Sequence, residues 1–208
     1  MKTVLIFDYD GVIVDSLDMF MTFFIQACKE NGWDEISTKQ DFLALFTGNM
    51  FENMMKLGMS RQDILSIVLK VKENLTNHLN ELPLFPTIKE TLEDLSKQNT
   101  LIISTSNDTT VVEKFLTLNK LTCFTKVYGS DLHHSKIKKI EMIKECYPAE
   151  HYIYIGDTIG DIIEGKKANI QTIGVTWGWH TKDQILSSKP DYLAESIQDL
   201  VIISNNLN

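Results

Sequence analysis

Arginine is almost absent from the chain, which contains only Arg61. The formal net charge is -8 and the isoelectric point is near 5.1. A protein that binds nucleic acid needs clustered basic side chains to neutralise a row of phosphates, so this composition argues against a nucleic-acid partner. A small anionic substrate would need a local source of positive charge, either a metal ion or a lysine.

Cysteines and long apolar runs are also scarce. Cys28, Cys123 and Cys146 form no C-x-x-C pair, so we expect neither a disulfide framework nor a zinc site. The first apolar run, Val4–Phe7, stops at Asp8 and is too short for a signal peptide or a membrane span. These absences predict reduced thiols, no membrane partner and a cytoplasmic location, and they leave the oligomeric state open.

The chain has the composition of a folded α/β protein. It has 208 residues, 43% hydrophobic and 23% charged, which suits one domain with an insertion or two small domains. Short apolar runs separated by helical patterns predict strands covered on both faces: Val4–Phe7, Leu101–Ser104, Tyr152–Ile155 and Thr172–Thr176. Helical connections between such strands imply a doubly wound parallel sheet.

Residues 16–82 break this alternation, because they contain helical patterns and no convincing strand. The predicted helices there are Ser16–Asn31 and Ser60–Leu82. Pro86 suits the first turn of the next predicted helix, Thr87–Lys97. We therefore expect an α-helical cap at 16–82, inserted into a core formed by 1–15 and 83–208.

Two carboxylates, Asp8 and Asp10, follow the first predicted strand. Two such charges about 4 Å apart repel by roughly 4 kcal/mol at an effective dielectric near 20, so a divalent cation or a shared proton is needed between them. Mg²⁺ prefers such oxygen ligands, and a carboxylate can attack phosphorus while its neighbour moves a proton. Gly11 permits the sharp turn that such a site requires. The alternative is an Asp-rich turn without chemistry.

A second pair of acids, Asp157 and Asp161, follows the predicted strand Tyr152–Ile155. A spacing of four across a strand-to-helix turn lets both carboxylates face one crevice. Simple capping of the helix is the alternative.

Two weaker signals lie between these acid pairs. Thr105 and Ser106 end a predicted strand and can offer hydroxyl and backbone N–H groups to a phosphate, although an N-cap at Asp108 also explains the stretch. Lys136 opens an amphipathic helix and can offset the charge of a nucleophile, although most lysine runs are solvated.

Taken in order, these stretches resemble the motifs of the haloacid dehalogenase-like phosphatase superfamily. Asp8–Val12 resembles its first motif, Thr105 the second, Lys136 the third and Gly156–Asp161 the fourth. The end of the chain, from Gly174 to Tyr192, is similar to the phosphoglycolate-phosphatase-like branch.

The resemblance implies a Rossmann-like core, a helical cap and a Mg²⁺ cofactor held by Asp8, the Asp10 carbonyl and Asp157, with Asp161 in support. It implies that Asp8 is the nucleophile and Asp10 the acid and base. Thr105, Ser106 and Lys136 would bind the phosphoryl group, with Lys136 preferred over Lys138 by its spacing to Gly156. The implied activity is hydrolysis of a small phosphorylated metabolite: phosphoglycolate, a sugar phosphate or a nucleotide.

Two residues depart from the family pattern. Val12 stands where many of the phosphatases carry Thr, which admits other phosphoryl-processing relatives. Phe20 stands where the sugar-phosphate mutases carry a cap-hinge histidine, which favours hydrolysis over a β-phosphoglucomutase-like reaction. A non-enzymatic phosphoaspartate signalling or binding module is the alternative from another class.

The cap contains one stretch that resembles the family's substrate loop. Thr47, Gly48 and Asn49 are the residues expected to face the active site, although a plain interhelix turn fits them equally well. Trp177 and Trp179 are interpreted as aromatic packing under their loop rather than as part of the crevice.

Overall fold

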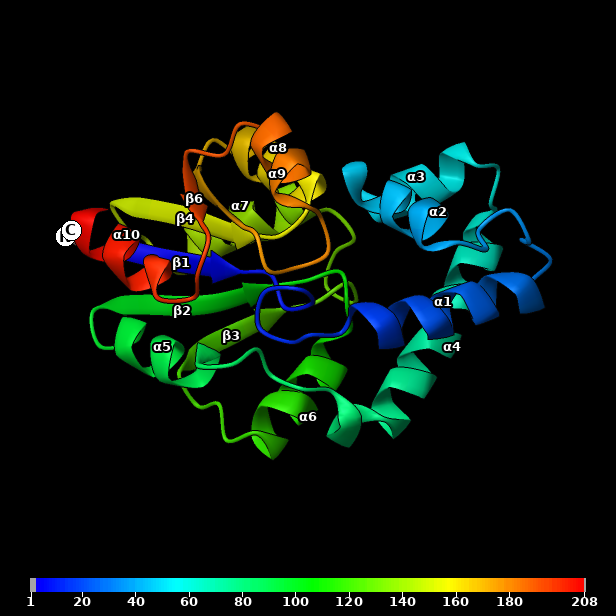
Figure 1. Ribbon diagram of the computed structural model, residues 1–208, viewed down its shortest axis with the longest axis horizontal. Coiled ribbons are helices and arrows are strands. Elements are labelled where there is room, and N and C mark those ends of the chain that lie inside the picture. The colour runs from blue at the N-terminus through cyan, green and yellow to red at the C-terminus, as the bar shows by residue number, and fades with distance from the viewer. Residues whose placement is uncertain (1–2, 208) are drawn as a thin grey trace.

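The computed structural model describes residues 3–207, which contain a parallel sheet of six strands in the order β3-β2-β1-β4-β5-β6 (Figure 1). The strands are β1 Thr3–Phe7, β2 Asn99–Ser104, β3 Phe124–Tyr128, β4 His151–Gly156, β5 Gln171–Val175 and β6 Tyr192–Ala194. The order reverses between β1 and β4, which pair directly. This confirms the predicted doubly wound α/β fold.

Both faces of the sheet are covered by helices, which explains why its central strands are uninterrupted apolar runs. Along β1, Leu5 and Phe7 belong to one core cluster, and Val4 and Ile6 belong to the other. The core helices are α5 Ile88–Leu95, α6 Thr109–Leu118, α7 Lys136–Cys146, α8 Ile159–Lys167, α9 Lys182–Ser187 and α10 Asp199–Leu207. Among residues 3–207, no helix is long and apolar enough to cross a membrane.

Between β1 and α5 the chain forms a helical layer beyond the carboxyl ends of the strands (Figure 1). It consists of α1 Leu17–Glu30, α2 Lys39–Ala44, α3 Met50–Lys56 and α4 Arg61–Asn77, with short 3-10 turns at Leu45–Thr47 and Leu79–Glu81. Helices α1 and α4 pack against each other through Phe24, Ile67 and Val71 among other buried side chains. We propose that residues 16–82 form the cap, and that the core comprises 1–15 and 83–208, whose end residues 1, 2 and 208 lie outside the described residues.

Several predicted boundaries were wrong. The helix expected to run from Ser60 to Leu82 ends at Asn77, and the following 3-10 turn carries the chain back toward the core. The helix expected from Thr87 starts at Ile88, because Thr87 itself adopts a left-handed conformation with φ 66°. Pro86 therefore lies outside the first turn of α5.

Strands β3 and β6 were not among the four predicted strands. In β3 only Val127 and Tyr128 are buried, because this strand lies at the edge of the sheet and its first residues are partly solvated. Strand β6 has only 3 residues and forms the opposite edge. Neither strand presents the continuous apolar run that identifies a central parallel strand.

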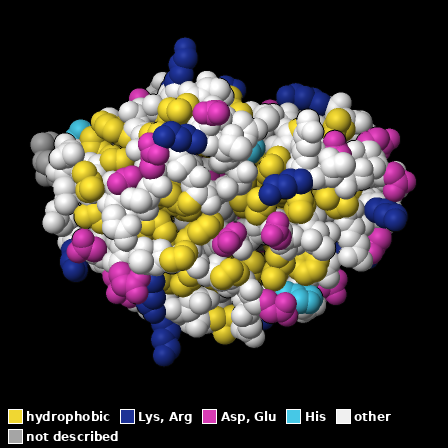
Figure 2. Space-filling model, viewed as in Figure 1, with side chains coloured by type: hydrophobic (Ala, Val, Ile, Leu, Met, Phe, Trp, Pro, Cys, Tyr) yellow, Lys and Arg dark blue, Asp and Glu magenta, His cyan; other side chains and the backbone are white. Residues whose placement is uncertain are grey.

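On the face seen in Figure 2, lysine and arginine side chains are scattered singly among acidic ones. This face presents no basic stripe of the kind that tracks a nucleic-acid backbone.

Candidate active site

The carboxyl ends of β1 and β4 bring the two acid pairs together. Phe7 pairs with Ile155 in the sheet, and the backbone N–H of Asp8 donates to the Ile155 carbonyl at 2.8 Å. Asp8 and Asp157 therefore follow the carboxyl ends of two neighbouring strands and lie on the same side of the sheet's end. Carboxylate oxygens of Asp8, Asp157 and Asp161 all lie within 4.8 Å of one another, and the three residues are buried.

Two glycines hold the Asp157 side chain in a narrow space. Gly11 has φ +76°, and a Cβ there would collide with the Asp157 carboxylate. A Cβ on Gly178 would collide with Asp157 from the other side. The backbone N–H of Trp179 donates to Asp157 Oδ2 at 2.7 Å, whereas Asp157 Oδ1 is buried without a hydrogen-bond partner. A buried carboxylate oxygen without a hydrogen-bond partner is suited to bind a cation or a proton.

Lys136 supplies the positive charge of the site from the N-terminus of α7. Its Nζ lies 2.7 Å from Asp8 Oδ2 and also contacts Asp161. Burial lowers the pKa of Lys136, but the charges of Asp161 and Asp8 outweigh burial, so its pKa is raised and the ammonium persists. Lys138, the alternative considered from spacing, points to solvent and pairs with Glu141 at 2.7 Å.

Asp161 also caps the helix on which it lies. Its Oδ2 accepts hydrogen bonds from the backbone N–H of Thr158 at 3.0 Å and from the Thr158 hydroxyl at 2.7 Å, which forms a capping box. Burial raises the pKa of Asp161, but Lys136 and Thr158 lower it further than burial raises it. Asp161 is therefore ionised beside Lys136.

The positive charge of Lys136 is too small to balance the negative charges of Asp8, Asp157 and Asp161 together. Burial raises the pKa of Asp8 from 3.8 to about 7, even though Lys136 lowers it. Burial, with the charges of Asp161 and Asp8, raises the pKa of Asp157 well above its ordinary value. The folded chain thus disfavours full ionisation of its own acid cluster, and a bound cation would relieve this repulsion.

Asp10 lies on the other side of Asp8, after the turn at the end of β1. Asn107 Nδ2 donates to Asp10 Oδ2 at 3.3 Å, and Asp10 Oδ1 is buried without a hydrogen-bond partner. Burial raises the pKa of Asp10 from 3.8 to about 6, despite lowering by Ser16, Asn107 and Lys136. A carboxyl group with this pKa can give and take a proton near neutral pH.

Thr105 and Ser106 follow β2 and line a small pocket with Asp8, Asp10 and Lys136. The backbone N–H of Thr105 is engaged by the Tyr128 carbonyl at 3.0 Å, so Thr105 can offer only its hydroxyl. That hydroxyl accepts from the Asn107 N–H at 3.0 Å, which leaves its own hydrogen free to donate.

The expected cap loop contacts the core, but Thr47, Gly48 and Asn49 do not line this small pocket. A Cβ on Gly160 would lie 2.5 Å from the Gly48 carbonyl oxygen, so the loop rests directly on the first turn of α8. Asn49 Nδ2 donates to Glu164 Oε1 at 3.2 Å and to the His134 carbonyl at 3.1 Å, and the Thr47 hydroxyl donates to the Ala44 carbonyl at 2.8 Å.

Three aromatic side chains that the sequence did not predict as site residues line the pocket, and the interpretation of Trp179 as packing outside the crevice was wrong. Phe20 from α1, Phe46 from the cap loop and Trp179 all contribute to its wall. Trp179 packs edge-on against Phe46 with ring centroids 4.8 Å apart, and against Phe20 at 5.4 Å. The position of Trp179 directly after Thr176-Trp177-Gly178 was a usable signal, but packing alone explained it.

Lys139 is a further residue that the sequence did not single out. It is fully buried, and its ammonium donates to the carbonyl of Thr105. Burial, reinforced by the charge of Lys136, lowers the pKa of Lys139 to about 7. Lys139 lies one turn after Lys136 on α7, and its hydrogen bond to the Thr105 carbonyl holds the Thr105 segment in place.

A doubly wound parallel sheet with a buried carboxylate cluster and an ammonium group at its strand ends is the arrangement of an α/β protein with a site suited to an anionic group. The sequence profile described as haloacid dehalogenase-like hydrolase matches residues 5–175. The chain belongs to this family, which confirms the resemblance noted in the sequence and the predicted hydrolase class.

Relatives with assigned names cover nearly the whole chain. The chain is 27% identical over 208 residues to pyrophosphatase PpaX of Oceanobacillus iheyensis, covering 96% of this chain and 95% of that protein. It is 26% identical over 201 residues to a phosphoglycolate phosphatase of Synechococcus elongatus, covering 95% and 94%.

Solved structures agree with the fold. A haloacid dehalogenase-like family hydrolase from Streptococcus pneumoniae superposes with a TM-score of 0.77 at 26% identity, covering 97% of this chain and 98% of that one. A structure titled a predicted phosphatase, from Clostridium acetobutylicum, gives a TM-score of 0.82 at 20% identity, covering 96% of both chains.

Proposed function

We propose that this chain is a Mg²⁺-dependent phosphatase that hydrolyses a small phosphomonoester through an aspartyl phosphate on Asp8. The observation that carries the proposal is the ion pair between Lys136 Nζ and Asp8 Oδ2 at 2.7 Å, beside a pocket lined by Thr105 and Ser106. A buried carboxylate held by an ammonium group beside hydroxyl donors is suited to attack on phosphorus. The names of the relatives support the same reaction class.

The residues present fit a Mg²⁺ ion. Asp8, Asp157 and Asp161 offer hard carboxylate oxygens within 4.8 Å of one another, and Asp157 Oδ1 lacks any hydrogen bond. We propose that Asp8, the Asp10 carbonyl and Asp157 hold the ion, with Asp161 supporting the set through its position beside Lys136. When bound, the ion neutralises charge on the cluster and on the phosphoryl oxygens.

The reaction uses side chains of the chain itself in two steps. First, an Asp8 carboxylate oxygen forms a bond to phosphorus while the bond from phosphorus to the alcohol oxygen breaks, and Asp10 gives its proton to that oxygen. Second, Asp10 takes a proton from a water whose oxygen attacks phosphorus, which releases phosphate and regenerates the Asp8 carboxylate. Lys136 and the hydroxyls of Thr105 and Ser106 hold the phosphoryl oxygens during both steps.

The alternatives considered from the sequence gain no support. Phe20, at the position of the mutase hinge histidine, packs against Phe24, Phe42 and Trp179 and carries no group that moves a proton. A signalling receiver is a single compact domain with its phosphorylated Asp on an internal strand, whereas here the paired acids follow β1 and an inserted layer of helices comes next.

Release of p-nitrophenol from p-nitrophenyl phosphate tests the proposal. We expect turnover with millimolar Mg²⁺ and loss of turnover with excess EDTA, restored by added Mg²⁺. Equal turnover in EDTA would contradict the metal requirement, and no turnover with any metal would contradict the phosphatase itself.

A further inference from the structure

A second cavity adjoins the pocket at Asp8 on the side of Asp10. Its volume is about 190 Å³, and it shares Phe20 and Ser106 with the small pocket. Asn107, which hydrogen-bonds to Asp10, also lines it. Because Asp10 is the group proposed to protonate the departing alcohol, this adjoining cavity is a space into which the leaving group of the substrate can extend.

The walls of this cavity are mostly apolar and come from the cap. The apolar lining residues are Phe20, Phe24, Met50, Leu65, Val68, Leu69 and Val71. Its size compares with an apolar cavity of roughly 150 Å³ that holds benzene. One six-membered ring or a short branched alkyl group therefore fits.

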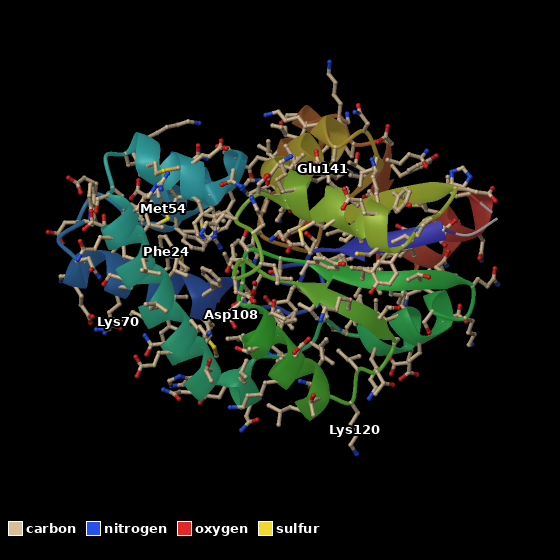
Figure 3. All side chains as sticks on the ribbon, turned by 180° about the vertical axis from the view of Figure 1, so that it is seen from behind. Phe24, Met54, Lys70, Asp108, Lys120 and Glu141 are labelled. Atoms are coloured by element: carbon tan, nitrogen blue, oxygen red, sulfur yellow. The ribbon has the colours of Figure 1, made fainter. Side chains whose placement is uncertain are left out.

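The polar residues of the cavity provide no free cation for an anionic leaving group. Lys72 Nζ on α4 forms an ion pair with Asp108 Oδ2 at 2.8 Å. Asp108 lies where the helical layer meets the core (Figure 3). Asp131 adds a further carboxylate, which accepts hydrogen bonds from the N–H and hydroxyl of Thr109 at 2.8 and 2.7 Å. Burial, with the charges of His133 and Lys139, lowers the pKa of His134, so this residue is neutral at neutral pH.

Arg61, the one arginine of the sequence, does not supply the inner cavity with a free positive charge. Arg61 lines a separate outer cavity of about 560 Å³, where Glu52 also lies. The two cavities share Leu65, Val68 and His134, but Arg61 does not line the inner one. A short anionic leaving group in the inner cavity would therefore lie near the carboxylates of Asp108 and Asp131. The one lysine there, Lys72, is already paired with Asp108.

Resting on the proposed phosphatase activity, we infer that the leaving group of the substrate is uncharged and largely apolar, an aryl-methyl or branched alkyl alcohol, rather than glycolate or phosphate. An anion placed among Phe24, Val68 and Val71 loses its hydration and gains no cationic partner, because the other polar groups of the lining, on Ser106, Asn107 and Ser130, are uncharged. The mouth of the cavity supports the inference: Leu65 and Leu69 on α4 are 58% and 54% exposed and would be covered by an apolar substrate.

Specificity constants for phosphate release with Mg²⁺ test the inference on four substrates: benzyl phosphate, glycerol phosphate, phosphoglycolate and pyrophosphate. Benzyl alcohol and glycolate are both alkanol leaving groups, so their ratio reports on the cavity more than on leaving-group acidity. We expect kcat/KM for benzyl phosphate to exceed that for phosphoglycolate and for pyrophosphate at least tenfold, with glycerol phosphate between them.

Two variants test whether the cavity charge sets this ratio. Asp108→Asn retains an N-cap for α6 but leaves Lys72 without its carboxylate partner, so relative use of phosphoglycolate should rise several-fold. Leu65→Lys places an ammonium group at the cavity and should act in the same direction. Leu186→Lys is the matched control, because Leu186 is 45% exposed on α9 and does not line the cavity.

The outcomes separate the inference from the proposed function. Phosphate release that favours phosphoglycolate or pyrophosphate would overturn the inference and leave the phosphatase intact. Preference for glycerol phosphate over benzyl phosphate would overturn the inference that the leaving group is apolar. If the ratio of kcat/KM for phosphoglycolate to that for benzyl phosphate is unchanged in both Asp108→Asn and Leu65→Lys, the role of the cavity charge is overturned. No metal-dependent release from any substrate would remove the proposed function and the inference with it.

Discussion

Lys136 Nζ lies 2.7 Å from Asp8 Oδ2, although the two residues are 128 positions apart in the chain. The same ammonium contacts Asp161, so a single cation joins the ends of β1 and the first turn of α8. Both partners are buried, which means that solvent screens this interaction far less than a surface ion pair. The position of Lys136 therefore governs both the charge and the orientation of the proposed nucleophile.

Replacing Lys136 by Met should lower kcat/KM for p-nitrophenyl phosphate by about 100-fold or more, the usual effect of removing one preorganised donor from an anion site. Lys138→Met is the matched control and should retain activity within about twofold, because Lys138 pairs with exposed Glu141. Similar losses in the two variants would show that Lys136 has no specific role.

Gly11→Ala should damage the site beyond its backbone strain. Gly11 and Gly32 have similar φ values of +76° and +80°, so Ala costs about 1–2 kcal/mol of left-handed strain at either position. A Cβ at Gly11 also collides with the Asp157 carboxylate, whereas a Cβ at Gly32 meets nothing within 4 Å. Urea unfolding should show the larger loss for Gly11→Ala, and only this variant should lose Mg²⁺-dependent turnover.

Stabilisation of the fold by Mg²⁺ should increase with pH. The pKa of Asp8 is about 7 in the folded chain against 3.8 ordinarily, so the folded state binds more protons than the unfolded state between these values. The metal-free free energy of unfolding must then fall as pH rises from about 4 to about 7, and a bound cation reverses that loss.

Thermal unfolding with and without millimolar Mg²⁺ measures this effect. The rise in Tm should be larger at about pH 8 than at about pH 5, because ligand carboxylates must be deprotonated to bind a metal. Asp157→Asn removes one buried charge and should raise the metal-free Tm at the higher pH while abolishing the Mg²⁺ effect. An equal Mg²⁺ effect at both pH values would contradict a buried carboxylate site.

Gly160→Ala should weaken turnover by moving the cap loop. Alanine favours a helix more than glycine does, by about 1 kcal/mol, so α8 itself gains stability. The new Cβ would lie 2.5 Å from the Gly48 carbonyl and 2.9 Å from the Phe46 carbonyl, and neither backbone group can yield without the loop shifting. We expect about tenfold lower kcat/KM with unchanged or higher Tm; full activity would show that this contact has no part in turnover.

The convergence of Asp8 with Asp157 could be predicted from sequence, because buried parallel strands are uninterrupted apolar runs and ligands bind beyond their carboxyl ends. The first and third predicted strands are β1 and β4, which pair directly in the sheet, and this brings both acid pairs to the same end of neighbouring strands. The choice of Lys136 over Lys138 came from the family resemblance and not from the residues alone.

Contacts between cap and core could not be predicted. Phe46 and Trp179 are brought together by the docking of an entire helical layer, which no local pattern encodes. The burial of Lys139 was equally hidden, because Lys136, Lys138 and Lys139 are chemically identical and only the rotation of α7 decides which of them faces the core. The edge strand β3 was not predicted, because its first residues are exposed and its sequence has the pattern of a loop.

The most direct measurement is to quench the enzyme during turnover of a phosphomonoester with Mg²⁺, digest it and locate the acid-stable phosphate by mass spectrometry. We expect phosphate on Asp8 in the natural chain and neither phosphate nor turnover in a folded Asp8→Asn variant. Phosphate on another residue, or normal turnover in Asp8→Asn, would contradict the proposal that Asp8 attacks phosphorus.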